Sequence, residues 1–476
     1  MLFSSIVFLF YFFPIAFLLY YLCAFSRLLQ NVILLILSIL FYAWGEPVNV
    51  LILIASILIN SLAGYLVAEK NKKSKNFRRT VLILDIVLNT GVLFVFKYLG
   101  FFVGMMEPFT GPVEVNIALP IGISFYTFQA ISYVVDVYKG IVKPANPFYV
   151  GLYISFFPQL IAGPIVQYKS VEDQIKNRKS SIEKVSVGIS RFAVGVIKKV
   201  ILANSFAEIA DYVFNWSAIG NDKMIVPASL AWLGSIGYSL QIYYDFSAYS
   251  DMAIGLALCF GFKFSENFDY PYAADSVSDF WKKWHISLTN WFREYVYFPL
   301  GGSRVKNKDV MVRNLFIVWL FTGIWHGANW TFIVWGLFYF VIQLAERFFR
   351  YTDSMPKWAR HLYTLLVVNF AWVLFRADNL YQAGVFIKNM LGVNHNGIWS
   401  EMAAMLLREY WFFFLAGIFF SMPVGRDINE YLYNNPRKLC SRIATIGYPI
   451  LMCVLFVLSV SYLMSGSYNP FIYFNF

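Results

Sequence analysis

The chain has 476 residues, of which 59% are hydrophobic and only 14% charged. Since a soluble protein carries about 25% charged residues, this composition excludes an ordinary soluble enzyme and indicates a membrane protein. The formal net charge of +11 would suit a nucleic-acid partner in a soluble protein. Here the basic residues lie in loops between apolar runs, which indicates membrane topology instead, and no nucleic-acid partner is expected.

Membrane-spanning helices need about 20 apolar residues each. Candidate spans lie near residues 4–22, 31–44, 48–68, 80–103, 313–345 (as two segments), 362–376, 409–422 and 443–464. The first run has no basic n-region and no small-residue cleavage site, so we expect it to remain as a span. By length, the sequence predicts an all-α polytopic membrane protein with about 11 or 12 transmembrane helices.

The middle of the chain, residues 115–300, is apolar but interrupted by Pro, Gly and charged residues. Irregular backbone at membrane depth persists only where protein or a water-filled cavity covers it. We therefore expect re-entrant segments around a central funnel, within one transmembrane domain over residues 1–476. The predicted parts of this domain are N-terminal helices (1–114), a catalytic core (115–345), C-terminal helices (346–464) and an extracellular aromatic tail (465–476).

Basic clusters predict the orientation of the chain. They occur at residues 70–79, 347–360 and 426–442, and the positive-inside rule places all three in the cytoplasm. Counting spans outward from the first and last clusters places both termini outside the cell.

Histidine is scarce, and His326 has the most unusual setting of the four. The stretch around it is mostly apolar for more than ten positions on both sides, and Gly323 and Gly327 bracket it. An ionisable group at such depth normally faces a cavity and has a function. The alternative is a histidine that only hydrogen-bonds a neighbouring helix.

His285 lies in the segment 280–293, among tryptophans and the cations Lys282, Lys283 and Arg293. The segment fits catalysis or an interfacial amphipathic helix equally well. His361 and His395 are expected to be ordinary surface residues.

Several familiar motifs are missing from the sequence. It has no Walker A loop, no GxSxG elbow and no HExxH. Its four cysteines are far apart, with no CxxC, and predict neither a zinc site nor a disulfide framework.

Particular segments of the chain, taken together, resemble one known family. These are residues 269–272 (Asp-Tyr-Pro-Tyr), 280–293, 297–302, the Trp-His-Gly-Ala block at 325–328, the opening residues 1–10, and residues 120–138 and 156–164. They resemble the membrane-bound O-acyltransferase (MBOAT) family, and within it the alginate O-acetyltransferases and the related peptidoglycan and cellulose O-acetylases. The resemblance covers nearly the whole chain, and the pair of Trp-His blocks is its most specific part.

The resemblance implies a multi-helix funnel with a thin centre in a bacterial plasma membrane. The family's invariant histidine corresponds to His326, and its second polar position corresponds to His285. The implied donor is a cytosolic acyl thioester, acetyl-CoA in the first instance, with no bound cofactor or metal. The implied partner is an extracytoplasmic protein of SGNH-hydrolase type that acetylates a polysaccharide. The D-alanyl transferases of teichoic acid lack the N-terminal pattern, so a D-alanyl carrier protein is the less favoured donor.

Acyl transfer from a thioester to a hydroxyl needs a base, and imidazole, with an ordinary pKa near 6.5, suits this role. We assign the role to His326. Candidate donors to the oxyanion are backbone amides near Gly327, the Asn329 side chain and His285; His285 could instead position the thioester.

Four basic residues are candidates for binding the phosphates of CoA: Lys282, Lys283, Arg293 and Arg304. The alternative is that they only reflect the positive-inside rule.

The C-terminal tail contains Tyr473 and four other aromatic residues. Ten residues from Leu463 can extend about 30 Å, enough for the tail to return into an outer funnel. A similar aromatic tail with a tyrosine occurs on a small partner of the D-alanyl system, so Tyr473 is the candidate acyl relay. The alternative is an aromatic anchor at the lipid headgroups.

A transporter or flippase is the alternative from another functional class. It would also have broken helices and polar residues at depth, but it gives no reason for the paired Trp-His blocks.

Overall fold

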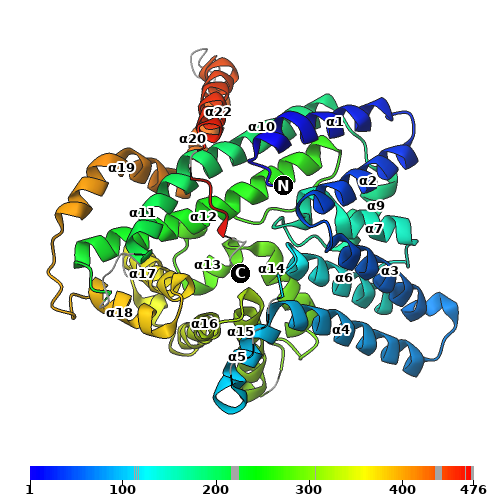
Figure 1. Ribbon diagram of the computed structural model, residues 1–476, viewed down its shortest axis with the longest axis horizontal. Coiled ribbons are helices and arrows are strands. Elements are labelled where there is room, and N and C mark those ends of the chain that lie inside the picture. The colour runs from blue at the N-terminus through cyan, green and yellow to red at the C-terminus, as the bar shows by residue number, and fades with distance from the viewer. Residues whose placement is uncertain are drawn as a thin grey trace. The chain divides into compact units, whose positions relative to one another are not determined.

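The computed structural model describes residues 1–111, 113, 115, 117–215, 224–305, 307–434, 442–466 and 468–472. Within these ranges the chain is helical and contains no strand (Figure 1), which confirms the all-α prediction. The chain divides into two units. Unit 1 comprises residues 1–192 and 249–266, and unit 2 comprises residues 193–248 and 267–476. Whether the four parts predicted from the sequence are functional divisions stays a prediction.

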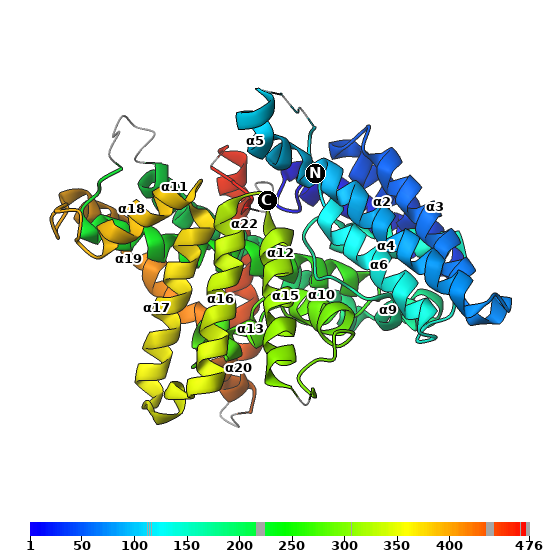
Figure 2. The same cartoon turned by 90° about the horizontal axis from the view of Figure 1, so that it is seen from below.

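Unit 1 is built mainly from the N-terminal helices, several of which run side by side (Figure 2). Its elements are η1 (Phe8–Phe12), α1 (Phe13–Leu22), α2 (Arg27–Gly45), α3 (Val50–Val67), η2 (Glu69–Asn71), α4 (Lys75–Lys97), α5 (Leu99–Thr110), α6 (Ile123–Tyr138), α7 (Pro147–Ser155), α8 (Phe157–Leu160), α9 (Tyr168–Asn177) and most of α10 (Ile182–Ile197). Side-chain caps fix the starts of α2, α4 and α7: Ser26 accepts from the Leu29 amide, Ser74 from the Phe77 amide and Asn146 from the Tyr149 amide. The span predicted at 80–103 corresponds to α4, which is long and apolar enough to cross a membrane. It ends earlier than predicted, because the α-helix breaks at Tyr98 between α4 and α5.

Unit 2 contains the remaining elements. They are η3 (Lys198–Ala203), α11 (Asn204–Phe214), the first two thirds of α12 (Ala228–Cys259), η5 (Pro271–Ala273), α13 (Val277–Lys283), α14 (Ile286–Phe292), η6 (Arg293–Tyr297), α15 (Lys308–His326), α16 (Trp330–Phe349), η7 (Tyr351–Ser354), α17 (Lys357–Arg376), α18 (Leu380–Met390), α19 (Glu401–Ser421), α20 (Val424–Asn434), η8 (Ile443–Gly447) and α22 (Tyr448–Met464). Figure 2 shows α15, α16 and α17 side by side. The run predicted at 313–345 does form two helices, α15 and α16.

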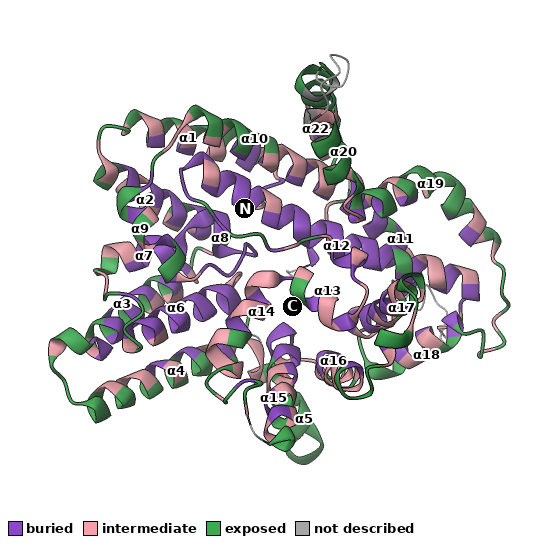
Figure 3. Cartoon of the chain, turned by 180° about the vertical axis from the view of Figure 1, so that it is seen from behind, coloured by how far each residue is buried: buried purple, intermediate pink, exposed green. Residues whose placement is uncertain are grey.

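Seven described helices are long and apolar enough to cross a membrane: α2, α3, α4, α16, α17, α19 and the helix at Thr445–Met464. The outer helices α19 and α22 expose much of their apolar surface (Figure 3), as lipid contact requires. The chain is therefore a multi-pass membrane protein. The larger number of 11 or 12 transmembrane helices, which was estimated from length alone, stays a prediction, as does the orientation of the termini.

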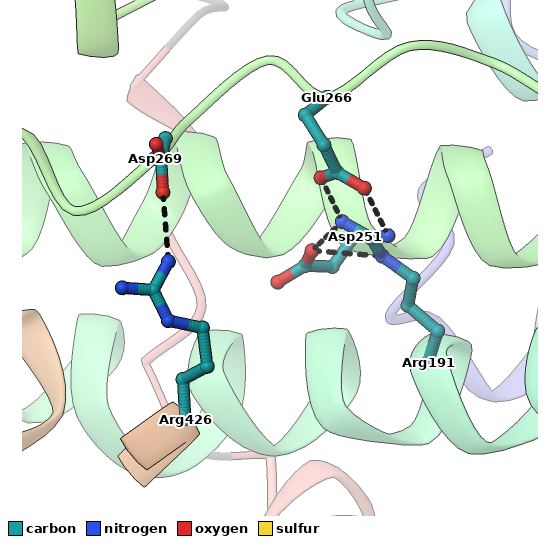
Figure 4. Close-up of polar contacts among 5 residues, drawn as sticks. All are labelled: Arg191, Asp251, Glu266, Asp269 and Arg426. Atoms are coloured by element: carbon teal, nitrogen blue, oxygen red, sulfur yellow. Dashed lines mark hydrogen bonds and ion pairs between the residues drawn. The ribbon is translucent and has the colours of Figure 1, made fainter. Parts of the chain in front are cut away.

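Close helix packing and ion pairs connect the elements within unit 1. A Cβ atom on Gly188 of α10 would lie 2.7 Å from the carbonyl oxygen of Gly255 on α12, so the two backbones meet where both residues are glycine. Figure 4 shows Arg191 between two carboxylates: its Nη2 lies 2.9 Å from Oδ1 of Asp251, and its Nη1 donates to Oε1 of Glu266 at 2.6 Å. These contacts fix the loop after α12.

Candidate functional site

His326 is the last residue of α15, where that helix turns into α16. The turn is possible because the two helices approach unusually closely. A Cβ atom on Gly323 would lie 2.5 Å from the carbonyl oxygen of Phe332, and one on Gly336 would lie 2.5 Å from that of Trp319. Only glycine permits this approach, and it places the end of α15 against the start of α16.

An aromatic cluster encloses the imidazole of His326, which is 6% exposed. The ring centroids of Trp325, Trp335 and Phe375 lie 5.0, 4.9 and 5.2 Å from that of His326, all nearly perpendicular to it. Edge-to-face packing of this kind fixes ring orientation. The three side chains come from α15, α16 and α17, so the helical hairpin and its neighbour together shape the surroundings of the predicted base.

His285 lies at the break between α13 and α14, and its backbone has the left-handed values φ 44° and ψ 54°. Such values are uncommon for a residue with a side chain and tend to persist at functional sites. The side chain is 1% exposed. Its ring packs edge-on against Phe246 of α12, with centroids 4.6 Å apart.

Asn267 orients the His285 imidazole. Oδ1 of Asn267 lies 3.2 Å from Nδ1 of His285 and also accepts from the Ser287 amide at 3.1 Å and the Ser287 hydroxyl at 2.8 Å. Because an amide oxygen only accepts, the contact with His285 places a proton on Nδ1 and makes Nε2 the accepting nitrogen. Burial lowers the pKa of His285 to about 3, so the ring is neutral at cellular pH.

Trp325 packs near both histidines. Its ring centroid lies 5.0 Å from that of His326 and 6.2 Å from that of His285. The two Trp-His blocks are 41 positions apart in the sequence. Trp284 of the first block belongs to an aromatic core of unit 2, and His326 of the second packs against Trp335 of the same core. The structure thus brings together the two histidines singled out in the sequence.

Glu346 of α16 holds the start of α13 and is 7% exposed. Its Oε1 accepts from the Val277 amide at 2.8 Å, and its Oε2 accepts from the Ser278 amide at 3.0 Å and the Ser278 hydroxyl at 2.8 Å. A carboxylate at a helix N-terminus satisfies amides that have no partner within the helix. Glu346 therefore positions the short helix that leads to His285.

The predicted oxyanion donor Asn329 acts as a helix cap. Its Oδ1 accepts from the Thr331 amide at 3.1 Å, which starts α16, and its Nδ2 donates to the Asp378 carbonyl at 2.7 Å. Both ends of the side-chain amide are therefore in use within unit 2, and its role toward an oxyanion stays a prediction.

The predicted phosphate-binding cations lie on the surface of unit 2. Lys282, Arg293 and Arg304 are exposed. Lys283 is half-buried, and its Nζ lies 2.7 Å from Oδ2 of Asp279. Of these four, Lys283 thus has a carboxylate partner on its own helix.

The remaining predicted residues lie apart from the two histidines' aromatic surroundings or outside the described structure. His395 is exposed, and Nδ1 of the partly buried His361 lies 3.0 Å from the Ala274 carbonyl oxygen. Tyr473 lies outside the described residues, which end at Ile472. The described part of the tail is docked on unit 2, where Phe471 and Ile472 are 6% and 7% exposed.

Sequence reasoning missed Asn267 and Glu346. Glu346 could have been noticed, since a carboxylate in the apolar run of α16 needs a polar partner. Asn267 carries no such signal, because its contact with His285 depends on how the loop after α12 folds back.

Residues 33–382 match the sequence model of MBOAT, the membrane-bound O-acyltransferase family. The whole chain is 37% identical to a probable alginate O-acetylase of Pseudomonas putida and 33% identical to a peptidoglycan O-acetyltransferase of Helicobacter pylori, covering 100% and 98% of those proteins. It is also 30% identical to a teichoic acid D-alanyltransferase of Bacillus subtilis, over 55% of this chain and 68% of that one. The likeness to the two O-acetylating proteins therefore extends through both ends of the chain, whereas the likeness to the D-alanyltransferase leaves nearly half of it unmatched.

Proposed function

The chain belongs to the membrane-bound O-acyltransferase family, and from this premise we propose that it carries an acetyl group from a cytosolic thioester to an extracytoplasmic partner that acetylates a polysaccharide. Membership of the family makes the chain a membrane acyltransferase and removes the transporter alternative. The observation that carries the choice of acetyl is the full-length match to O-acetylating relatives. The D-alanyltransferase relative matches only 55% of the chain, which favours acetyl over D-alanyl.

The proposed chemistry begins at His326. Its imidazole takes the proton of an acceptor hydroxyl while that oxygen attacks the thioester carbonyl carbon. The tetrahedral intermediate collapses with cleavage of the C–S bond, and the proton passes from the imidazole to the departing thiolate. The products are an acetyl ester and free CoA thiol. The burial of His326 among three aromatic rings supports this role, because exclusion of water limits hydrolysis of the thioester.

His285 is proposed to orient a reactant. With its proton on Nδ1, directed to Asn267, its Nε2 accepts and does not donate. In that tautomer Nε2 can accept a hydrogen bond from the acceptor hydroxyl and so align it, but Nε2 has no proton to donate to an oxyanion. The lowered pKa of His285 makes it a weak base, which leaves proton removal to His326.

The donor is proposed to be acetyl-CoA, approached from the cytosolic side. Lys282, Arg293 and Arg304 are exposed cations around the α13–η6 region, where they could bind the phosphates of CoA as charge-assisted donors. Lys283 is the weaker candidate because Asp279 already neutralises it.

Tyr473 is proposed as the acyl relay that passes acetyl to an SGNH-type partner outside the cell, with both chain termini extracytoplasmic. The support is that the residues before it are docked: the Ile472 amide donates to Oδ2 of Asp245 at 2.8 Å. Phe246, the next residue of α12, packs against His285. A tail that served only as a lipid anchor would not need burial of Phe471 and Ile472.

Purified protein in lipid nanodiscs, incubated with acetyl-labelled CoA, tests the proposal. We expect label on the peptide that contains Tyr473, and its transfer to an SGNH partner and then to glycan. The Tyr473→Phe variant should lose both the label on this peptide and the transfer of acetyl to the partner, while still binding acetyl-CoA. Labelling by D-alanyl carrier protein but not by acetyl-CoA would refute the donor, and full transfer by Tyr473→Phe would refute the relay.

A further inference from the structure

A buried ion pair in unit 2 holds the C-terminal tail. Nζ of Lys199, on η3, lies 2.7 Å from Oδ1 of Asp245, on α12, and both side chains are 3% exposed. Each charge also contacts the tail backbone. Lys199 Nζ donates to the Pro470 carbonyl oxygen, and Oδ2 of Asp245 accepts from the Ile472 amide at 2.8 Å. The ion pair thus binds the tail backbone at Pro470 and at Ile472.

Contacts with side chains of the preceding tail residues continue this docking. The Tyr468 hydroxyl donates to Oδ2 of Asp211 at 2.7 Å, and Asp211 is itself paired with Arg376 at 2.8 Å. Nδ2 of Asn204 donates to Oδ1 of Asn469 at 3.2 Å. The tail is therefore fixed by η3, α11 and α12 before the chain reaches Tyr473.

Stability alone does not account for a pair of this kind. Removing two charges from water offsets most of their attraction, and well-packed apolar residues of similar size are often as stable or more so. Apolar residues could not, however, bind a backbone carbonyl and a backbone amide at once. The ion pair therefore determines which tail residues lie against Lys199 and Asp245, that is, the register of the tail on unit 2.

The register of the tail matters because Asp245 lies next to a residue of α12 that contacts His285. The next residue, Phe246, has its ring 4.6 Å from that of His285. One short stretch of α12 therefore contacts both the tail, one residue before Tyr473, and the histidine of the α13–α14 break.

We propose that Lys199 and Asp245 are positioning residues that dock the C-terminal tail on unit 2 and so present Tyr473 for acyl transfer. The proposal rests on Tyr473 being the acyl acceptor. Lys199 and Asp245 act through the tail backbone, without touching the reacting atoms.

A charge swap separates docking from simple stabilisation. The double variant Lys199→Asp/Asp245→Lys restores the attraction, but aspartate at 199 cannot donate to the Pro470 carbonyl and lysine at 245 cannot accept from the Ile472 amide. A purely structural pair would be rescued by the swap. We expect the swap to leave acetyl-CoA KM unchanged and to lower acetyl transfer to the tail at least about tenfold, since a misplacement of about 1 Å can cost roughly 10²-fold.

A variant in the tail tests the same contact without risk to the fold. Ile472→Pro deletes the amide that Asp245 accepts from and leaves the ion pair intact, whereas the control Ile472→Val keeps the amide. Arg191→Met is a second control, since it breaks an ion pair of unit 1 that does not involve the tail. We expect Ile472→Pro to lose transfer and both controls to keep it.

Trimming with a carboxypeptidase, followed by intact-mass measurement, reports docking independently of chemistry. The wild-type chain should resist trimming near Ile472, while the charge-swap variant should be trimmed past Ile472. The Ile472→Pro variant is left out of this comparison because proline itself slows carboxypeptidases. A charge-swap variant that is protected from trimming and transfers acetyl as the wild type does would overturn the proposal. If Tyr473→Phe transfers normally, the relay fails, and the trimming result still decides whether Lys199 and Asp245 dock the tail.

Discussion

Replacing Glu346 by alanine should loosen the helix that leads to His285. The Glu346 carboxylate accepts three hydrogen bonds at 2.8–3.0 Å from Val277 and Ser278. Hydrogen bonds to a charged group contribute about 1.5–3 kcal/mol each, and buried donors that lose their partner add a penalty. Because such terms are not additive, we expect a loss of about 3–5 kcal/mol for Glu346→Ala. Glu346→Gln keeps the size and one acceptor oxygen, and should lose about 1–2 kcal/mol.

The assay is the half-life of activity during heating in nanodiscs, since membrane proteins often unfold irreversibly, together with kcat and KM for acetyl-CoA. We expect the half-life to order as wild type, Gln, then Ala, with kcat falling more than KM rises. Asp353→Ala is the matched control, because Asp353 forms an exposed pair with Arg350, and such pairs contribute only about 0–1 kcal/mol. A Glu346→Ala variant as stable and active as Asp353→Ala would refute the positioning role.

Three further substitutions give distinct outcomes. Gly336→Ala places a Cβ 2.5 Å from the Trp319 carbonyl oxygen, so we expect about 1–3 kcal/mol of destabilisation, visible as a shorter half-life; an unchanged half-life would contradict the close packing. Asn267→Ala removes the acceptor for His285 Nδ1 and should lower kcat at least about tenfold with little change in KM; a pure KM effect would speak against orientation of the ring. The pKa of His285 is lowered by burial to about 3, so its contribution to stability is complete above pH 6.5 and falls as pH drops toward 3, by up to about 1.4 kcal/mol per unit. His285→Asn should therefore show a flatter decline in half-life between pH 7 and pH 5 than wild type, and equal slopes would exclude this role.

The sequence predicted the helical parts of the molecule best where apolar runs were long. The α15–α16 hairpin follows from one such run, interrupted near His326 by Gly327 and the polar residue Asn329. The break at Tyr98 between α4 and α5 was missed, because the run of apolar residues continues across it. The periodicity and length of apolar runs indicate which segments lie in lipid. They do not indicate where the backbone dihedral angles change locally.

The candidate site was predictable only in part. His326 and His285 stood out because ionisable residues beside membrane segments are rare, and Trp325 lies near both rings. Asn267 and Glu346 could not be paired with their partners from the sequence, since each contact joins residues 18 or more positions apart across a loop or between helices. The same holds for the pair of Lys199 and Asp245.

The central claim is that His326 removes the acceptor proton, and single-turnover release of CoA thiol tests it most directly. Wild type, His326→Gln and the exposed-histidine control His395→Gln are compared in nanodiscs, after binding of acetyl-CoA and thermal stability are shown to match. The account predicts release at the wild-type rate for His395→Gln and a loss of about 10²–10⁴-fold for His326→Gln, the usual contribution of a general base. Release by His326→Gln at the wild-type rate, from a folded protein that binds its donor, would contradict it.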